Sequence, residues 1–256
     1  QYTVTEVQAP QGYTRSETRT VTVSNSSSPS SPAALSISDS PLALRFTKTD
    51  ALTGEPVDGA AFSLYNGETL VKLRMISEGV YTPDDNGNTT FTTTVGSALI
   101  APLAVGTYTI SEEQVAGGYA PAADVSGTII EDHLSENPLA VTMVDAPLAL
   151  TIRKLDSVTG QLVDGATFRL FDSHGNVVSV STIAGRSSWY CVDKNGSADF
   201  AVPDGSATIV CLPQDAYELQ EVSAASGYAL AAGTTTTVVG SYNTYTSPAT
   251  VTVENK

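Results

Sequence analysis

The sequence contains the same nine-residue pattern twice, 106 residues apart. Leu42–Asp50 (LALRFTKTD) returns as Leu148–Asp156 (LALTIRKLD), and Val57–Ala60 (VDGA) returns as Val163–Ala166 at the same offset. Repetition at a fixed spacing indicates that one structural unit is built more than once. The spacing therefore predicts tandem domains of roughly 105–110 residues that share a fold.

The similarity continues to the end of each copy. After the first third the offset grows to 109, so the second copy carries three extra residues. The matching pairs are Asn86-Gly87 with Asn195-Gly196, Tyr108–Glu112 with Tyr217–Glu221, and Gly118-Tyr119 with Gly227-Tyr228, and the copies close with Val141–Asp145 and Val251–Asn255. Because type I′ turns need positive φ at both central positions, Asn-Gly between β-rich runs predicts hairpins at both pairs.

The first 39 residues resemble the final third of a copy. Tyr2–Glu6 lies 106 positions before Tyr108–Glu112, and Asp39 lies 106 positions before Asp145. We therefore predict the C-terminal part of a preceding domain at 1–39, which an upstream segment would complete, followed by whole domains at 40–146 and 147–256. The run at 26–32 has the Ser/Pro-rich composition of a linker. Its matched spacing instead predicts a loop between the last two strands of that first copy.

The composition predicts an all-β fold. Only 15% of residues are charged, and Ser, Thr, Asn and Gly dominate the other polar positions, which is typical of exposed strands and turns. Several short β-rich runs with turn signals between them, repeated in about 105–110 residues, indicate a β-sandwich in each copy.

Charge and cysteine content exclude several function classes. Twelve Lys plus Arg against 27 Asp plus Glu give a net charge of −15, which repels phosphate backbones and anionic lipids, so neither nucleic acid nor a membrane is an expected partner. No apolar run is long enough to span a bilayer. The two cysteines, Cys191 and Cys211, lack metal-site spacing, so we expect no metal and no cofactor. A disulfide between them and a pair of buried thiols fit the sequence equally well.

Side-chain alternation along strands places ionisable groups on apolar faces, because residues i, i+2 and i+4 of a strand share a face. Lys48 follows Leu42, Leu44 and Phe46 on one face, and Lys154 follows Leu148, Leu150 and Ile152. In the middle strand of each copy, the equivalent face ends in a glutamate: Glu6, Glu112 or Glu221. In the closing strand, it ends in an aspartate or asparagine: Asp39, Asp145 or Asn255. Each copy is therefore expected to point its glutamate and its Asp or Asn into the core.

Three such groups together can react. Burial lowers the pKa of a lysine and raises that of a carboxylic acid, so both tend towards their neutral forms. A neutral amine is a nucleophile, and a neutral acid or carboxamide is an electrophile. A protonated glutamate beside them can stabilise the developing oxyanion and carry protons to the leaving group. The product would be a Lys–Asp or Lys–Asn amide, formed with loss of water or ammonia.

These motifs resemble tandem CnaB-type domains of Gram-positive surface proteins and pilins, which are Ig-like β-sandwiches. The resemblance rests on Phe46–Asp50, on Tyr108–Glu112 followed by Gly118-Tyr119, and on Val141–Ala146, and it covers both complete copies and residues 1–39. It implies an isopeptide bond between Lys48 and Asp145 promoted by Glu112, and one between Lys154 and Asn255 promoted by Glu221. In the first copy Glu6 and Asp39 are present, but the partner lysine would precede Gln1.

The resulting hypothesis is a stalk segment of a cell-wall-anchored, extracellular adhesin or pilin that crosslinks itself once and is not a turnover enzyme. Its expected partners are other pilin subunits or a host protein or glycan. One alternative is a buried Lys–Glu–Asp cluster without a covalent bond. A second is a ligand-binding adhesin module using the loops at 70–84 and 178–189, for which an exposed Trp189 beside a groove would be evidence. A third is a spacer in a secreted enzyme.

Overall fold

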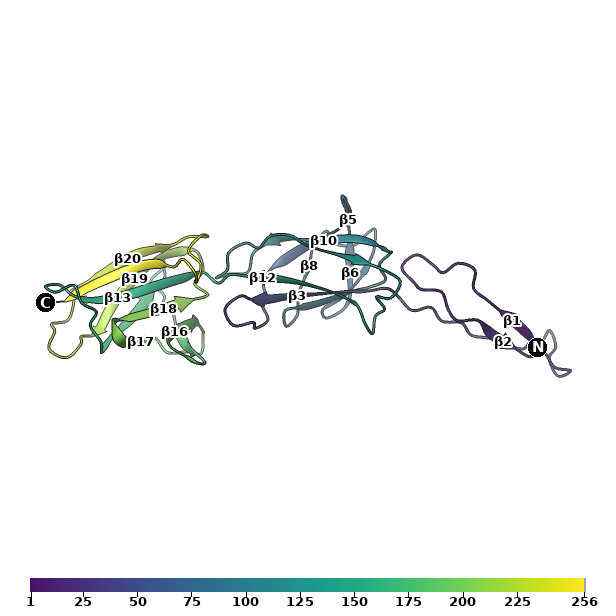
Figure 1. The fold of residues 1–256 in the computed structure, drawn as a ribbon, viewed down its shortest axis with the longest axis horizontal. Coiled ribbons are helices and arrows are strands. Elements are labelled where there is room, and N and C mark those ends of the chain that lie inside the picture. The colour runs from purple at the N-terminus through teal and green to yellow at the C-terminus, as the bar shows by residue number, and fades with distance from the viewer. Residues whose placement is uncertain (256) are drawn as a thin grey trace. The chain divides into compact units, whose positions relative to one another are not determined.

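The computed structural model describes residues 1–255 and is almost entirely β-structure (Figure 1). The described chain forms two compact units. The first comprises residues 1–49, 56–114 and 123–143, and the second comprises residues 50–55, 115–122 and those from Val144 onward. The all-β prediction is confirmed. Residues 1–255 contain no helix with the length and apolar character needed to cross a bilayer.

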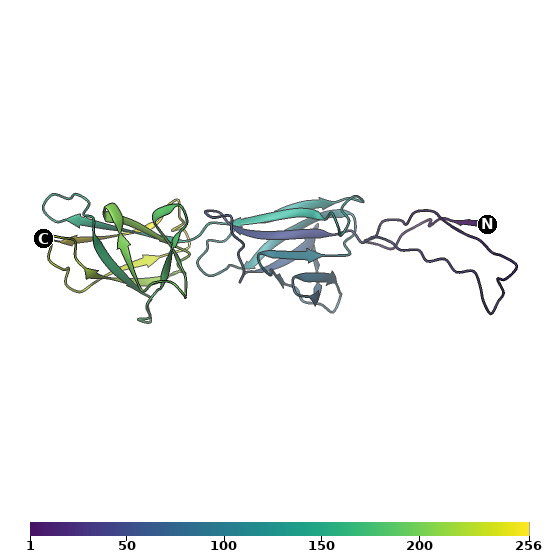
Figure 2. The ribbon, with the colours of Figure 1, turned by 90° about the horizontal axis from the view of Figure 1, so that it is seen from below.

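The first complete copy consists of two sheets (Figure 2). One has the order β12-β3-β9-β7-β6, and the other has the order β11-β10-β4-β5 with β8 beside β4. The bounds are β3 Leu44–Asp50, β4 Ala61–Asn66, β5 Thr69–Val71, β6 Leu73–Ser77, β7 Val80–Pro83, β8 Phe91–Thr92, β9 Ser97–Ile100, β10 Gly106–Gln114, β11 Val125–Ile129 and β12 Leu139–Asp145. Phe46 of one sheet packs edge-to-face on Phe62 of the other, with ring centroids 4.7 Å apart. The core therefore lies between the sheets.

The second copy repeats this arrangement. Its sheets have the orders β15-β16-β18-β13-β21 and β17-β14-β19-β20. The bounds are β13 Ala149–Asp156, β14 Ala166–Phe171, β15 Val180–Ile183, β16 Arg186–Val192, β17 Asp199–Val202, a 3-10 turn at Pro203–Gly205, β18 Ser206–Val210, β19 Asp215–Ser223, β20 Thr234–Val239 and β21 Ala249–Asn255. Ile152, Phe168 and Leu219 are fully or almost fully buried between these sheets.

The first and last strands of each copy lie side by side. β13 and β21 pair in parallel, with Lys154 opposite Val253 and Asp156 opposite Asn255. β3 and β12 are likewise neighbours in their sheet, and the hydroxyls of Thr47 and Thr142 are 2.8 Å apart. Along β3 the burial alternates as predicted, because Leu44, Phe46 and Lys48 are buried while Arg45 is exposed. The strand that carries the lysine therefore neighbours the strand that carries the Asp or Asn.

Residues 1–39 differ from the expectation. β1 (Tyr2–Val4) and β2 (Arg19–Val21) form a two-stranded antiparallel sheet, and residues 33–40 form no strand. The side chain of Tyr2 is 63% exposed and that of Ile37 is 39% exposed. The predicted closing strand and its inward-facing stripe are therefore wrong for this segment, because no second layer of the described chain covers the two-stranded sheet. The run at 26–32 forms turns.

The predicted hairpins at the Asn-Gly pairs are also wrong. Asn86-Gly87 joins β7 to β8, and these two strands belong to different sheets; Asn195-Gly196 joins β16 to β17 in the same way. No residue of either pair has a positive φ. The carboxylate of Asp84 accepts the N–H of Asn86, which makes an Asx turn in place of type I′ geometry. Glycine is needed at position 87 for space, since a Cβ there would lie 2.6 Å from the backbone of Leu73.

Candidate functional site

Three strands of the second copy bring Lys154, Glu221 and Asn255 together. Lys154 lies near the end of β13, Glu221 lies in β19 of the opposite sheet, and Asn255 ends β21. Each follows apolar residues at i−2 on the core-facing side of its strand, as the alternation predicts. Lys154 is fully buried, and Glu221 and Asn255 are 4% and 3% exposed. Three polar side chains thus meet at one end of an apolar core.

Glu221 bridges the other two side chains. Its Oε1 lies 3.7 Å from Nζ of Lys154. Nδ2 of Asn255 donates hydrogen bonds to Oε1 at 3.0 Å and to Oε2 at 2.8 Å. The backbone N–H of Ala231 donates to Oε2 at 2.7 Å, which fixes the carboxylate from a third direction. The carboxylate therefore faces both the amine of Lys154 and the nitrogen that an amidation would expel from Asn255.

Two atoms of this cluster lack hydrogen bonds within the described chain. They are Nζ of Lys154 and Oδ1 of Asn255, both buried. Desolvation lowers the pKa of Lys154, and this effect opposes the attraction of the nearby Glu221 carboxylate. A buried lysine amine without a hydrogen bond is costly unless it becomes neutral or reacts. The cluster therefore holds a buried amine with a lowered pKa, next to a carboxylate that also accepts the carboxamide N–H of Asn255.

The first copy places Lys48 and Glu112 in the same way. Their side chains are 0% and 1% exposed, and Nζ of Lys48 donates to Oε1 of Glu112 at 2.7 Å. The ammonium also lies 5.3 Å from the ring centroid of Phe62, within range of a cation–π interaction. Asp145 is fully buried at the end of β12, the sheet neighbour of β3. The predicted Lys48–Asp145 crosslink stays a prediction.

Glu6 and Asp39 of the N-terminal segment are only partly buried. Oε2 of Glu6 accepts the N–H of Ser16 at 2.8 Å, ten residues further on, which matches the Glu221–Ala231 contact. Desolvation, followed by repulsion from Glu6 and a hydrogen bond to Glu6, raises the pKa of Asp39. Glu6 and Asp39 therefore interact, as Glu221 and Asn255 do in the second copy, although the segment is more exposed.

Sequence reasoning assigned no role to a tyrosine–aspartate pair beside each site. The hydroxyl of Tyr228 donates to Oδ2 of Asp156 at 2.8 Å, and that of Tyr119 donates to Oδ2 of Asp50 at 3.0 Å. The signal was present in the repeat, because each aspartate lies two residues after a repeated lysine and each tyrosine belongs to a repeated Gly-Tyr. The contact itself spans about 70 residues and cannot be derived from spacing.

The structure also brings Cys191 and Cys211 together. Their sulfur atoms are 2.9 Å apart, and both residues are partly buried thiols. The sequence leaves open a disulfide and a pair of buried thiols. The structure supplies the proximity that the disulfide requires. Among residues 1–255, no group of His, Cys, Asp and Glu side chains is arranged to hold a metal ion.

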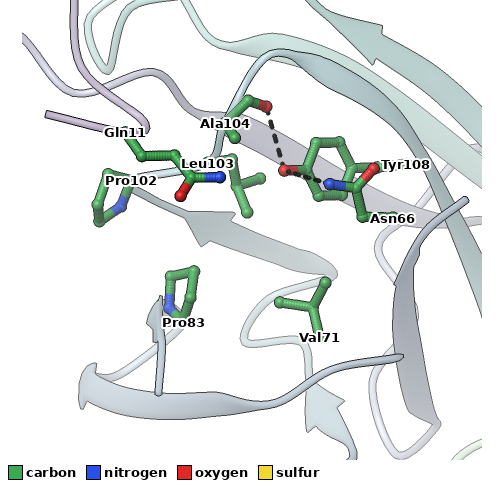
Figure 3. Close-up of a pocket in the computed structure, with 8 residues that line it drawn as sticks. All are labelled: Gln11, Asn66, Val71, Pro83, Pro102, Leu103, Ala104 and Tyr108. Carbon is green, nitrogen blue, oxygen red and sulfur yellow. Dashed lines mark hydrogen bonds between the residues drawn. The ribbon is translucent and has the colours of Figure 1, made fainter. Parts of the chain in front are cut away.

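Cavities lie at both loops of the ligand-binding alternative: one of about 580 Å³ has Val178 and Ser179 in its lining, and one of about 400 Å³ has Leu70 and Asp84. A cavity of about 270 Å³ in the first unit is lined by Pro102, Asn66 and Tyr108 among others (Figure 3). The hydroxyl of Tyr108 donates to the carbonyl of Ala104 at 3.1 Å, so its main polar group is already engaged. Trp189 is partly buried and has the guanidinium of Arg186 5.2 Å from its ring centroid. This intermediate burial matches neither a buried Trp, which would favour a stalk, nor an exposed one beside a groove, which would favour binding.

Comparison with solved structures returns a Bacillus anthracis protein and pilins. The Bacillus anthracis TIE protein is 16% identical with a TM-score of 0.42, and the match covers 88% of this chain. The chain spans only 37% of that protein. A Streptococcal ancillary pilin is 20% identical with a TM-score of 0.39, covering 97% of this chain and 76% of the pilin. The shaft pilin SpaA from Lactobacillus rhamnosus GG is 16% identical with a TM-score of 0.39, covering 84% of this chain and 98% of the pilin.

No curated protein matches the sequence. A family model does match it twice, at residues 43–141 and 149–256, and the model describes the SpaA prealbumin-like fold domain. These two matches cover most of the chain and contain Lys48, Glu112, Lys154, Glu221 and Asn255. The chain therefore belongs to the family of SpaA prealbumin-like fold domains.

Proposed function

We propose that this chain is a stalk segment of a cell-wall-anchored, extracellular adhesin or pilin, and that its complete domains are closed by Lys48–Asp145 and Lys154–Asn255 isopeptide bonds. Membership of the SpaA prealbumin-like family supports a structural role in a pilin or surface protein. The names of the structural neighbours, a shaft pilin and an ancillary pilin, agree with that role. Other pilin subunits are the partners that this proposal implies, with a host protein or glycan as a further candidate.

The observation that carries the proposal is the state of Lys154. Its amine is fully buried, has no hydrogen bond within the described chain, and lies 3.7 Å from a carboxylate that also holds the side-chain nitrogen of Asn255. A stable non-covalent cluster would satisfy such a group with hydrogen bonds. An amide bond reduces this requirement, because it replaces a charged group with three donors by a single uncharged N–H.

The proposed reaction conserves every atom. Glu221 accepts a proton from Nζ of Lys154, and the neutral amine attacks Cγ of Asn255. The protonated Glu221 then donates to Nδ2, with which it is already hydrogen-bonded, and ammonia leaves as the C–N bond breaks. The attacking nitrogen passes its second proton to the Glu221 carboxylate, so that a neutral amide and a protonated Glu221 remain. In the first copy the same steps join Lys48 to Asp145 with Glu112 as the proton carrier, and water leaves. Fixed proximity within the folded core supplies the rate that free amines and acids lack.

The bond would act on stability and on mechanical strength. It joins the first and last strands, so it closes a loop of almost a whole domain. By analogy with disulfides, a loop of about 100 residues gives roughly 4–5 kcal/mol of stabilisation through the unfolded state. Tension that enters at β13 and leaves at β21 would load the covalent bond, and the sheet would not be pulled apart. For residues 1–39, the Glu6–Asp39 pair would make its bond only with a lysine from outside this chain.

Intact-mass measurement of the denatured, reduced protein tests the proposal. We expect the chain to weigh less than its sequence predicts by one water plus one ammonia. A deficit of ammonia alone would confine the reaction to the second domain. An unaltered mass would show that both clusters are non-covalent.

A further inference from the structure

The chain's two cysteines occupy one edge of the second copy. Cys191 lies in β16, and Cys211 directly follows β18. The two strands pair in parallel, and Cys191 is in register with Val210, the neighbour of Cys211. Their sulfurs are 2.9 Å apart. Adjacent strands therefore hold the two thiols at contact distance without a change of register.

The backbone at Cys211 is unusual. Its φ is +61°, in the left-handed region that non-glycine residues seldom adopt. Cys211 also lies against a turn of the same compact unit: a Cβ at Gly118 would be 2.4 Å from the carbonyl oxygen of Cys211, and the hydroxyl of Tyr119 lies 3.8 Å from its sulfur. Residues that are held in sparsely populated conformations are commonly functional.

The pKa values of the two thiols shift in opposite directions. The hydrogen bond between the two thiols lowers the pKa of Cys191, although burial opposes the effect. The same hydrogen bond, together with burial, raises the pKa of Cys211. Because the thiolate is the nucleophile in thiol–disulfide exchange, Cys191 is suited to react first and Cys211 to resolve the intermediate.

We propose that Cys191 and Cys211 form a disulfide that pins the β15–β16 hairpin to β18 when the protein meets a disulfide oxidant. The Cys191 thiolate attacks the oxidant and forms a mixed disulfide, which releases one thiol. Cys211 then loses its proton and attacks the sulfur of Cys191, which releases a second thiol. In total, the two cysteines lose two hydrogens and the oxidant gains them.

The disulfide would lie where the β15–β16 hairpin meets the rest of its sheet. The β15–β16 hairpin joins the rest of its sheet through only three register pairs between β16 and β18. The corresponding β7–β9 contact in the first copy has two register pairs, and the positions equivalent to the cysteines hold Thr82 and Pro102. The disulfide would therefore reinforce an edge that the isopeptide bond between β13 and β21 does not reach.

Treating one sample of the protein with oxidised glutathione and another with a reductant tests whether the disulfide forms. After incubation with oxidised glutathione, the protein should be lighter than its reduced form by two hydrogens and should resist iodoacetamide after denaturation. Its second domain should melt roughly 5 °C or more above that of the reduced form. The first domain contains no cysteine, so its transition should not move.

A Cys191→Ser variant serves as the matched control, because it removes one sulfur and keeps a small polar side chain. Its melting should be insensitive to the oxidant, and Cys211 should remain available to iodoacetamide or carry one glutathione. Quantitative alkylation of both cysteines in oxidant-treated wild-type protein would overturn the proposal, and so would equal melting of the oxidised and reduced forms.

A separate observation concerns Asp156. Its Oδ1 accepts the N–H groups of Val158 and Thr159, each at 2.7 Å, and its Oδ2 accepts the hydroxyl of Tyr228. These bonds, the one from Thr159 first, lower the pKa of Asp156 to about 2. The turn that they organise directs the N–H of Ser157 onto the backbone carbonyl of Asn255 at 2.9 Å.

The same chain of contacts recurs beside the first site. Oδ1 of Asp50 accepts the N–H groups of Leu52 and Thr53, and its Oδ2 accepts the hydroxyl of Tyr119. The N–H of Ala51 donates to the carbonyl of Asp145 at 2.8 Å. In both copies an aspartate turn therefore holds the backbone of the residue that carries the electrophile, and a tyrosine holds the aspartate.

We infer that Asp156 and Tyr228 are positioning residues for the amidation, which makes this inference dependent on the proposed function. Tyr228 follows the strand that carries Glu221, and Asp156 follows Lys154 by two residues. The Tyr228–Asp156–Ser157–Asn255 chain thus links all three reacting side chains through their backbones. Its loss would let Asn255 move relative to the amine.

The test is the time course of ammonia loss after cell-free synthesis, followed by intact mass. Tyr228→Phe removes one hydroxyl and should slow the reaction by about tenfold or more, because small misplacements of reacting groups are costly. Tyr242→Phe is the control, because Tyr242 is 79% exposed. A merely structural role would lower the melting temperature without changing this rate.

Failure of the positioning inference can be distinguished from failure of the proposed crosslink. A Tyr228→Phe protein that loses ammonia as fast as wild type would overturn the positioning inference alone. Wild-type protein that never loses ammonia would overturn the proposed crosslink, and the positioning role with it.

Discussion

Replacing Glu221 with alanine is expected to abolish the bond between Lys154 and Asn255. The variant loses the carboxylate that contacts both Nζ of Lys154 and Nδ2 of Asn255, so no group remains to move the proton between them. Its intact mass should rise by one ammonia beyond the change due to the substitution, and the water lost by the first domain should stay lost. Without the covalent loop, the second domain should melt roughly 10 °C or more below wild type.

Glu218→Ala is the matched control for this variant. Glu218 lies in the same strand, three residues earlier, on the exposed face of β19. It should retain the wild-type mass deficit and nearly the wild-type melting temperature. Loss of ammonia in Glu221→Ala at the wild-type level would show that Glu221 is not the proton carrier.

Loss of the Lys154–Asn255 bond should also greatly increase the length to which single molecules extend when they are stretched from their ends. In the wild type, the bond joins Lys154 to Asn255, so the roughly 100 residues between them cannot lengthen. A Lys154→Met variant cannot form the bond, and unfolding of its second domain should release roughly 340 Å of additional chain, at about 3.4 Å per residue. Methionine suits this position because it fills a buried site with an unbranched side chain and no charge.

The first domain provides an internal reference in the same recordings. It should remain inextensible between Lys48 and Asp145 in both proteins, and Lys48→Met should release a comparable length from that domain alone. Extension of the wild-type second domain to its full length at ordinary unfolding forces would contradict a covalent clamp.

Local periodicity was sufficient to predict the faces of the reacting strands. Lys48 and Lys154 each follow alternating apolar residues, and that period of two is set by the strand itself. The repeat then located Glu112 and Glu221 by their matched spacing. These features depend on near neighbours along the chain, and the structure confirms the burial of all four side chains.

Features that depend on distant contacts were not predictable in the same way. Asn86-Gly87 has a hairpin sequence, but its strands belong to opposite sheets, and the carboxylate of Asp84 supports a different turn. The Tyr228–Asp156 bond joins residues 72 positions apart, and the sequence shows only that each recurs. For the cysteines, spacing leaves a bonded and an unbonded pair equally acceptable, and only the β16–β18 pairing brings them into contact.

Peptide mapping with trypsin tests the two isopeptide bonds most directly, because trypsin does not cleave after a lysine whose amine is bonded. We predict a branched peptide in which residues 154–169 are joined to residues 195–256, with a mass equal to their sum less one ammonia. A second should join residues 46–72 to residues 75–153, less one water. Fragmentation should place the branch points at Lys154 with Asn255 and at Lys48 with Asp145. Recovery of residues 75–153 and 195–256 as separate, unbranched peptides, with cleavage after Lys48 and Lys154, would contradict the account.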